Sequence, residues 1–210
     1  DVILYNLGVG ATEKDLDLVY EQADEFQPLP TFGVIPQFLG SSSVSFDFLP
    51  NFNPMMLLHG EQYLAIKGPV PTSGNLVNKP RIIEVLDKGK AAAVTTLITT
   101  YNRDSGEQVY ENQSTVFIRG SGGFNGKKSG RDRGAASAPN KPPQRAADKV
   151  ISEKTAESQA ALYRLSGDYN PLHIDPNFAS VGGFEKPILH GLCTMGISGK
   201  HVFRAFGPIK

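Results

Sequence analysis

Hydrophobic and polar positions repeat with a helical period near the start of the chain. The apolar positions that share one face of this stretch are Leu16, Val19, Tyr20 and Ala23. Thr12 precedes them, and Asp15 follows Thr12 at the spacing of a capping box. We therefore predict a helix that begins after Thr12. The next apolar stretch, residues 26–36, is interrupted by prolines, so any helix there is expected to be short.

From about residue 58 the pattern becomes that of β-strands. Four segments follow one another along the chain: HGEQYLAIKG, LVNKPRIIEVLDKG, AAAVTTLITTYN and QVYENQSTVFIRG. Asp87-Lys88-Gly89 and Asp104-Ser105-Gly106 separate the last three, and both tripeptides are typical of hairpin turns. A helix followed by consecutive antiparallel strands predicts an α+β fold.

Residues 121–149 show neither period and are rich in Gly, Ser, Ala and Pro. They contain seven Lys or Arg against two Asp. A nucleic-acid or phosphate-binding arm would carry such a charge, but aromatic residues do not interleave with the basic ones. We interpret the segment as a flexible, solvated linker between residues 1–120 and residues 150–210.

Helical periodicity returns after this linker. Thr155 is predicted to cap a helix that Gly167 ends, and a second helix is predicted from Gly191 onward. Each glycine in a helix interior costs about 1 kcal/mol relative to alanine. We therefore expect Gly196 and Gly199 to let the second helix approach a sheet closely, which makes it deeply buried. Its periodic positions are Leu192, Met195, Gly196, Gly199, Val202 and Phe203.

The composition is that of a soluble globular domain, with 40% hydrophobic and 20% charged residues. Basic and acidic residues number 21 each, so no overall field attracts nucleic acid or an anionic membrane. No apolar run approaches the roughly 18 residues of a membrane span. Cys193 is the single cysteine, which excludes a disulfide within the chain. The chain begins at Asp1 without an initiator methionine, and we interpret it as part of a longer protein.

The stretch SGDYNPLHIDP, residues 166–176, carries the candidate chemistry. Asp168 and His173 would point roughly 140° apart on a helix and to opposite faces on a strand. Only an irregular loop can aim both side chains at one point, and Asn170-Pro171 favours such a loop. Together they can hold and polarise a water, with Asn170 as support. The alternative is that Asp168 caps backbone amides and His173 is a core histidine; spacing alone leaves both open.

Asp175 within this stretch and Gly191 beyond it have different predicted roles. Asp175 precedes Pro176 and is interpreted as the structural N-cap of a short helix. Gly191 begins the second helix, where free amides can stabilise an oxyanion. His190 is interpreted as a residue that packs beside the site or supports its reacting groups, rather than as the proton donor, and Cys193 is interpreted as a core residue. None of the four histidines has metal-ligand spacing to another ligand, so no metal site is expected.

These motifs resemble a known family. The run YRLSGDYNPLHID, residues 163–175, is similar to the signature of the MaoC-like, (R)-specific enoyl-CoA hydratases. The match continues through Ala179 and through residues 186–196, where it resembles the hydratase 2 domains of peroxisomal multifunctional enzymes type 2. Residues 29–34 and 58–63 extend the similarity into the N-terminal half.

The resemblance implies a tandem, or double, hot-dog fold in which each repeat wraps an antiparallel sheet around a long helix. Residues 1–120 would form a degenerate N-terminal repeat that shapes an acyl tunnel. Residues 150–210 would begin the catalytic repeat. In this family further strands follow the position of Lys210, so the second repeat is expected to be incomplete in this chain.

The reaction implied by the resemblance is reversible syn hydration of trans-2-enoyl-CoA to (3R)-3-hydroxyacyl-CoA in fatty-acid β-oxidation, without metal or redox cofactor. Asp168, His173 and Asn170 would act on the water, and the Gly191 amide would polarise the thioester carbonyl. Which of Asp168 and His173 transfers each proton is open. The residues that would contact the CoA ester are His59, Gly60 and Lys88.

Partners and location follow from the resemblance as well. It implies a homodimer in the peroxisome, with a dehydrogenase domain fused in the parent protein. Taken alone, Lys88 would be interpreted as a solvated turn lysine. The alternatives to a hydratase are a hot-dog acyl-CoA thioesterase and a non-catalytic acyl-CoA-binding module.

Overall fold

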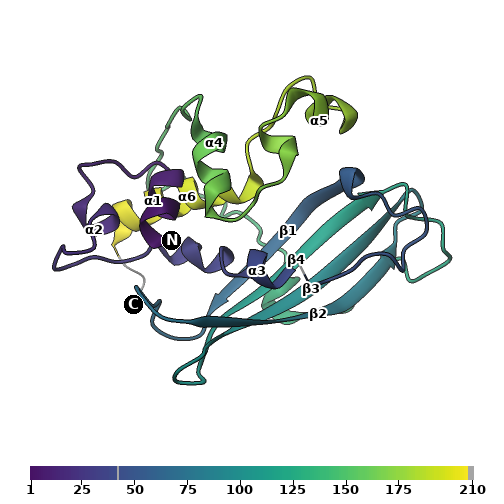
Figure 1. Ribbon diagram of the computed structural model, residues 1–210, viewed down its shortest axis with the longest axis horizontal. Helices are drawn as coiled ribbons and strands as arrows, with labels where there is room; N and C mark the ends of the chain where they lie inside the picture. Colours follow the sequence, from purple (N-terminus) through teal and green to yellow (C-terminus); the bar gives the residue numbers. More distant parts are fainter. Residues whose placement is uncertain (42, 208–210) are drawn as a thin grey trace.

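A computed structural model describes residues 1–41 and 43–207, so the last three residues of the predicted 150–210 segment lie outside the described part. A four-stranded antiparallel sheet lies beside a group of short helices and one long helix (Figure 1). The strands, in the order β1-β4-β3-β2 across the sheet, are β1 Leu57–Ile66, β2 Leu76–Asp87, β3 Ala91–Asn102 and β4 Gln108–Arg119. The α-helices are α1 Val2–Gly8, α2 Leu16–Val19, α3 Gln37–Ser41, α4 Gln159–Tyr163, α5 Pro176–Val181 and α6 Gly191–Phe206. The 3-10 helices are η1 Pro30–Val34, η2 Pro54–Met56, η3 Gly134–Ala136, η4 Arg164–Ser166 and η5 Pro171–His173.

The sheet confirms the predicted α+β fold and its hairpin turns. The turn after β2 contains Gly89 at φ +77° and the turn after β3 contains Gly106 at φ +72°, conformations that favour glycine. A bulge at Gly60 separates the paired residues His59 and Glu61 in β1. A β-carbon on Gly60 would overlap the Phe117 ring, so the close approach of the two strands requires glycine here. Asn112 in β4 is fully buried, which excludes its Asn-Gln-Ser sequence from glycosylation in the folded protein.

The N-terminal helices differ from the prediction. Thr12 does bond to Asp15, through its backbone N–H and its hydroxyl at 2.8 and 3.0 Å. The predicted start after Thr12 is nevertheless wrong, because Asp15 is itself the N-cap and α2 spans a single turn. Tyr20 then takes an extended conformation, which ends the helix. Helix α1 was not predicted; no side chain caps its first turn.

The start predicted for the helix after the linker is also wrong. Helix α4 begins at Gln159 with Ser158 at its N-cap, three residues beyond Thr155. The position predicted for its end is confirmed, because Gly167 follows η4 with φ +138°. This φ lies outside the ordinary left-handed helical region but is still one that favours glycine.

Helix α6 begins at Gly191 as predicted, but its neighbour is not the sheet. A β-carbon on Gly196 would overlap Val9 and lie 2.6 Å from the Tyr5 hydroxyl, and one on Gly199 would lie 2.6 Å from Thr31. These glycines therefore allow α6 to pack closely against α1 and η1. The prediction that they allow it to approach a sheet is wrong. The hydrophobic core at this contact contains Tyr5, Val9, Leu18, Leu29, Phe32, Val34, Tyr163, Leu192, Cys193, Ile197 and Phe203.

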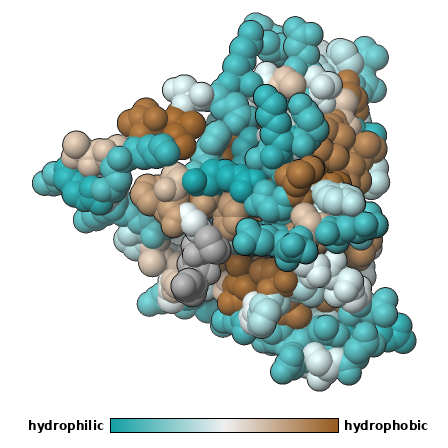
Figure 2. Space-filling view, turned by 90° about the vertical axis from the view of Figure 1, so that its left-hand side faces the viewer, coloured by the Kyte–Doolittle hydropathy of each residue, from teal (hydrophilic) through white to brown (hydrophobic). Residues whose placement is uncertain are grey.

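The predicted deep burial of α6 is wrong for one of its faces. Val202 and Phe206 are 49% and 65% exposed, and Leu16 of α2 is 56% exposed. On this side of the molecule, hydrophobic side chains lie in the open among hydrophilic ones (Figure 2). Among the described residues, no helix combines the length and the apolar composition that a membrane span requires.

Residues that follow β4 contact the sheet at several points. The Asp87 carboxylate accepts hydrogen bonds from the backbone N–H groups of Gly89 and Gly123, both at 2.8 Å. Arg131 donates its backbone N–H to Glu84 at 2.8 Å, and Arg133 donates to Gln113 at 3.0 Å. These bonds hold residues 123–133 against the sheet. The boundaries expected for a linker at 121–149 stay a prediction.

Asp87 should make stability depend on pH. The hydrogen bonds from Gly123 and then Gly89 hold the pKa of Asp87 below its ordinary value. A carboxylate with a depressed pKa stabilises the fold above its ordinary pKa, and this stabilisation is lost as the pH falls through the native pKa. Asp87→Asn should therefore lower the thermal unfolding midpoint at pH 7, with a difference from wild type that shrinks toward pH 3.

Asp104→Asn is the matched control, since Asp104 is exposed in the other hairpin turn. It should leave the midpoint unchanged at both pH values. Equal midpoints for Asp87→Asn and wild type at pH 7 would contradict the role given to Asp87.

Candidate active site

The loop that carries the candidate chemistry is fixed by its own side chains. Asn170 accepts a hydrogen bond from the Leu172 N–H at 3.0 Å and caps η5, with Pro171 at its first position. Asp175 accepts from the Asn177 N–H at 2.8 Å and caps α5. The turn at Asn170-Pro171 and the structural role of Asp175 are thereby confirmed. Two short helices, η5 and α5, each begin at a side-chain cap, and together they set the directions of the side chains on the loop.

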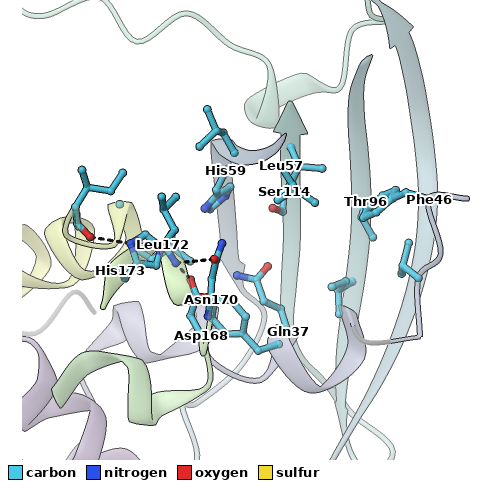
Figure 3. A pocket seen from close by; sticks show the side chains of 18 of the residues that line it. Gln37, Phe46, Leu57, His59, Thr96, Ser114, Asp168, Asn170, Leu172 and His173 are labelled. Carbon is cyan, nitrogen blue, oxygen red and sulfur yellow. Dashed lines mark hydrogen bonds and ion pairs between the residues drawn. The ribbon is translucent and has the colours of Figure 1, made fainter. Parts of the chain in front are cut away.

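Asp168 and His173 point toward each other, as Figure 3 shows. The carboxylate Oδ2 lies 4.0 Å from the imidazole Nε2, and the two side chains are 25% and 10% exposed. His173 Nδ1 lies 2.8 Å from the Ile188 carbonyl oxygen. A carbonyl can only accept, so Nδ1 carries the hydrogen, and in the neutral ring Nε2 is left as a lone pair that faces Asp168.

Both side chains line one cavity of about 450 Å³, which lies between the loop and the sheet. Its wall opposite the loop comes from the strands, and its floor from segments 37–46 and 188–192. Most of the wall is apolar, a usual property of small-molecule sites. The lining residues are Gln37, Phe38, Val44, Phe46, Leu57, Leu58, His59, Thr96, Ile98, Ser114, Val116, Asp168, Asn170, Leu172, His173, Ile188, Leu189, Gly191 and Leu192.

Gly191 meets the same cavity at the first position of α6. The N–H groups in the first turn of a helix lack intrahelical partners and lie at the positive end of its dipole. A β-carbon built on Gly191 would find no atom within 4 Å, so the space in front of the backbone is open. This combination can hold a developing negative charge on an oxygen atom.

The three residues expected to contact a CoA ester lie in different places. His59 lines the cavity, and its Nε2 donates to the Glu61 carbonyl at 2.9 Å. Gly60 forms the β1 bulge against Phe117. Lys88 lies in the turn after β2 and donates to the Lys128 carbonyl at 2.8 Å. Neither Gly60 nor Lys88 is among the described residues that line the cavity, and their contact with CoA stays a prediction.

His190 packs behind His173, the kind of position expected for a packing or supporting residue, although the stacking of the two rings was not predicted. Its ring stacks on His173 with 3.7 Å between centroids and 28° between planes. Potential ligand atoms of Asp168, His173 and His190 lie within 4.8 Å of one another, a grouping that sequence spacing missed. Nearly parallel ring planes do not direct their in-plane lone pairs at one point, so the geometry is poorly suited to a shared ion.

Burial sets the protonation of two neighbours of the site. Burial, and then the nearby His173, lower the pKa of His190 to about 4, so its ring is neutral at pH 7. Burial raises the pKa of the Cys193 thiol to about 12, and its side chain is fully buried in the core. A nucleophilic cysteine needs a thiolate and access to substrate, so Cys193 is a packing residue, as predicted.

Comparison with known proteins gives matches along the whole chain. Residues 1–120 match the family model described as the MFE-2 hydratase 2 N-terminal domain, and residues 136–209 match the MaoC like domain. The chain is 57% identical to a peroxisomal hydratase-dehydrogenase-epimerase of Neurospora crassa, over all of the chain but 24% of that protein. It is 44% identical to a peroxisomal enoyl-CoA hydratase 2 of Arabidopsis thaliana, over 97% of the chain and 70% of that protein.

A solved structure agrees with these matches. The crystal structure of a MaoC-like dehydratase from Phytophthora capsici superposes with a TM-score of 0.82 at 36% identity. The match covers 99% of this chain and 72% of that one. The fold described above is therefore shared with a protein of related sequence.

The environment of Cys193 predicts its reactivity. A thiol whose pKa is raised to about 12 and which is fully buried should not react with a thiol reagent at pH 8 in the native protein. In a denaturant the same thiol should react fully, which serves as the control. Rapid labelling of the native protein, followed by mass spectrometry, would show that Cys193 is accessible and would reopen its exclusion as a nucleophile.

Proposed function

The chain belongs to the MaoC-like hydratase 2 family, and we propose that it catalyses the reversible syn addition of water to trans-2-enoyl-CoA, giving (3R)-3-hydroxyacyl-CoA. The observation that carries this proposal is the convergence of Asp168, His173 and Gly191 on one largely apolar cavity. An acid/base pair and an oxyanion donor that face each other across a cavity meet the requirements of hydration next to a thioester carbonyl.

His173 is assigned the proton transfer. Its Nδ1 is occupied by the Ile188 carbonyl, so its Nε2 can take a proton from a water held between it and the Asp168 carboxylate. The water oxygen bonds to C3, and the C2–C3 π electrons move to the thioester carbonyl to give an enolate. His173 then returns the proton to C2. Since oxygen and proton arrive from the same face, the addition is syn.

The Gly191 N–H is assigned the stabilisation of the negative charge that develops on the substrate oxygen. As the enolate forms, its oxygen would accept a hydrogen bond from the Gly191 N–H at the start of α6. Loss of one such donor typically costs on the order of 10²–10³ in rate. Asn170 supports the site by holding η5, and thereby the direction of His173. Lys88, His59 and Gly60 are proposed to contact the CoA ester.

The finer architecture is part of the same proposal. We infer a tandem hot-dog fold in which residues 1–120 form the repeat that encloses the acyl chain and residues 150–210 carry the catalytic loop. The sheet supplies much of the cavity wall, with both apolar and polar side chains, and the loop supplies Asp168 and His173, which supports this division of roles. Residues 121–149 connect the two repeats. The reaction uses no cofactor beyond the CoA of the substrate.

The setting of the reaction is proposed from the relatives. The fungal relative is named for hydratase, dehydrogenase and epimerase activities, and both curated relatives are peroxisomal by name. We propose peroxisomal fatty-acid β-oxidation as the setting, a homodimer as the assembly, and a dehydrogenase as the enzyme that consumes the 3-hydroxyacyl product. Hydrolysis of the thioester is less well supported, because attack at the thioester carbonyl carbon would not require the loop of Asp168, Asn170 and His173 beside a glycine donor.

Asp168→Asn and His173→Gln should each lower turnover of trans-2-decenoyl-CoA by roughly 10²–10⁴, with little change in acyl-CoA binding. His173→Gln removes the base, Asp168→Asn removes the carboxylate charge that holds the water, and each change keeps a side chain of similar size. Loss of the enoyl-thioester absorbance measures hydration, and release of free thiol measures hydrolysis. Asp104→Asn and His201→Gln are matched controls that lie outside the cavity lining among the described residues. Wild-type rates in both site variants would refute the assignment.

Gly191→Ala should separate activity from stability. The added methyl group meets no protein atom, and alanine suits a helix better than glycine, so the unfolding midpoint should stay equal or rise. The same methyl group would occupy the space in front of the amide, so kcat/KM should fall at least about tenfold.

Gly196→Ala is the identical change five residues along α6. It should lower stability and leave the space in front of the Gly191 amide open. Its β-carbon overlaps Val9, so the unfolding midpoint should fall. Wild-type kcat/KM in Gly191→Ala would show that the space before this amide is not used by the substrate.

A further inference from the structure

His190 is buried next to the reacting groups without lining the cavity. Its side chain is 1% exposed, and among the described residues the cavity is lined by Leu189 and Gly191 on either side of it but not by His190 itself. One face of its ring stacks on His173, and the Tyr163 ring lies 4.9 Å away. Direct contact with substrate is therefore excluded by its place in the fold.

The hydrogen bond of His190 fixes its tautomer. Nε2 lies 3.2 Å from the Asp168 main-chain carbonyl oxygen, which can only accept, so Nε2 carries the hydrogen. Nδ1 is then a lone pair, and it is buried without a hydrogen-bond partner among the described residues. A purely apolar ring at this position would avoid the cost of that unpaired nitrogen. Among the residues that the structure describes, the imidazole makes one polar contact, to Asp168, and this contact needs an explanation.

We propose that His190 is a positioning residue that holds Asp168 and His173 in register with each other and with Gly191. Its N–H fixes the main chain of Asp168, its ring face fixes the plane of His173, and its own main chain forms the N-cap of α6. One side chain thereby sets the separation of the carboxylate and the imidazole. This inference rests on the hydration proposed above.

The neutrality of His190 serves this role. The charged and titratable groups that face its ring are His173, Asp168 and Arg164, with the Tyr163 phenol beside it. Burial and the neighbouring His173 keep His190 uncharged, so it neither repels a protonated His173 nor competes with it for the proton of the water. A charged residue in the same place would do both.

Two substitutions test the two contacts of His190, its stacking on His173 and its hydrogen bond to Asp168, separately. His190→Phe keeps an aromatic face against His173 but removes the donor to Asp168. His190→Gln keeps an amide donor but removes the ring. We expect His190→Phe to lose roughly 10–10²-fold in kcat at unchanged KM, the scale that a misplacement of about 1 Å produces, and His190→Gln to recover part of that loss.

Tyr163→Phe is the matched control. Its ring touches His190, while its hydroxyl has no partner among the described residues. It should keep wild-type kcat and KM. Wild-type kcat in His190→Phe, or a loss that appears in KM alone, would overturn the positioning role. So would a loss of kcat in His190→Phe that His190→Gln does not relieve at all.

A readout in the wild-type protein is independent of activity and of how the variants fold. Imidazole ¹⁵N chemical shifts should show His190 as the neutral Nε2–H tautomer at pH 7, and the neutral form of His173 as the Nδ1–H tautomer. A protonated His190 or the opposite His190 tautomer would overturn the inference even if hydration is observed. The expected tautomers without any hydration would instead leave the positioning geometry intact and refute the proposed function.

Discussion

The hydrogen bond from His173 Nδ1 to the Ile188 carbonyl is the constraint on which the rest of the site depends. It ties η5 to the segment that leads into α6, two parts of the chain that are 15 residues apart. It also decides which ring nitrogen is free to act on a water, because the bonded nitrogen must keep its hydrogen. If this bond were made by Nε2, the lone pair would point away from Asp168 and the pair could not share one water.

The helices around this bond explain how the loop that carries His173 is held in place. Helix α6 packs on α1 through Gly196, and Lys200 donates to the Gly10 carbonyl at 2.7 Å. Arg204 bonds to Asp15 and Asp17 on α2 at 2.7–2.9 Å. Helix α6, which begins at Gly191, is therefore anchored along its length by the N-terminal part of the chain. The sheet closes the cavity from the other side.

Local chemistry explains what the sequence could predict. The Asn170-Pro171 turn, the Asp175 cap and the strand turns at Gly89 and Gly106 each depend on residues close together in the chain, and these features are confirmed. The start of α4 was mispredicted because Thr155 and Ser158 are both good caps, and tertiary packing chose between them.

Contacts between distant residues explain what the sequence could not predict. Asp1 is at the N-cap of helix α1 but its side chain makes no capping bond, and the helix depends on its core contact with α6. The stacking of His173 on His190 has no local pattern at all, because it requires η5 and the N-cap of α6 to meet in space. The convergence of Asp168 and His173 also depends on how the loop packs in the fold. It could still be predicted, because the residues between them favour a loop.

The most direct test of hydration by this site is the fate of solvent atoms in the product. Turnover of trans-2-decenoyl-CoA in ¹⁸O-labelled D₂O should place one ¹⁸O on C3 in the R configuration and one deuterium on C2, added to the same face, with no free thiol released. Appearance of ¹⁸O in a free carboxylate together with CoA thiol, or an S configuration at C3, would contradict the account.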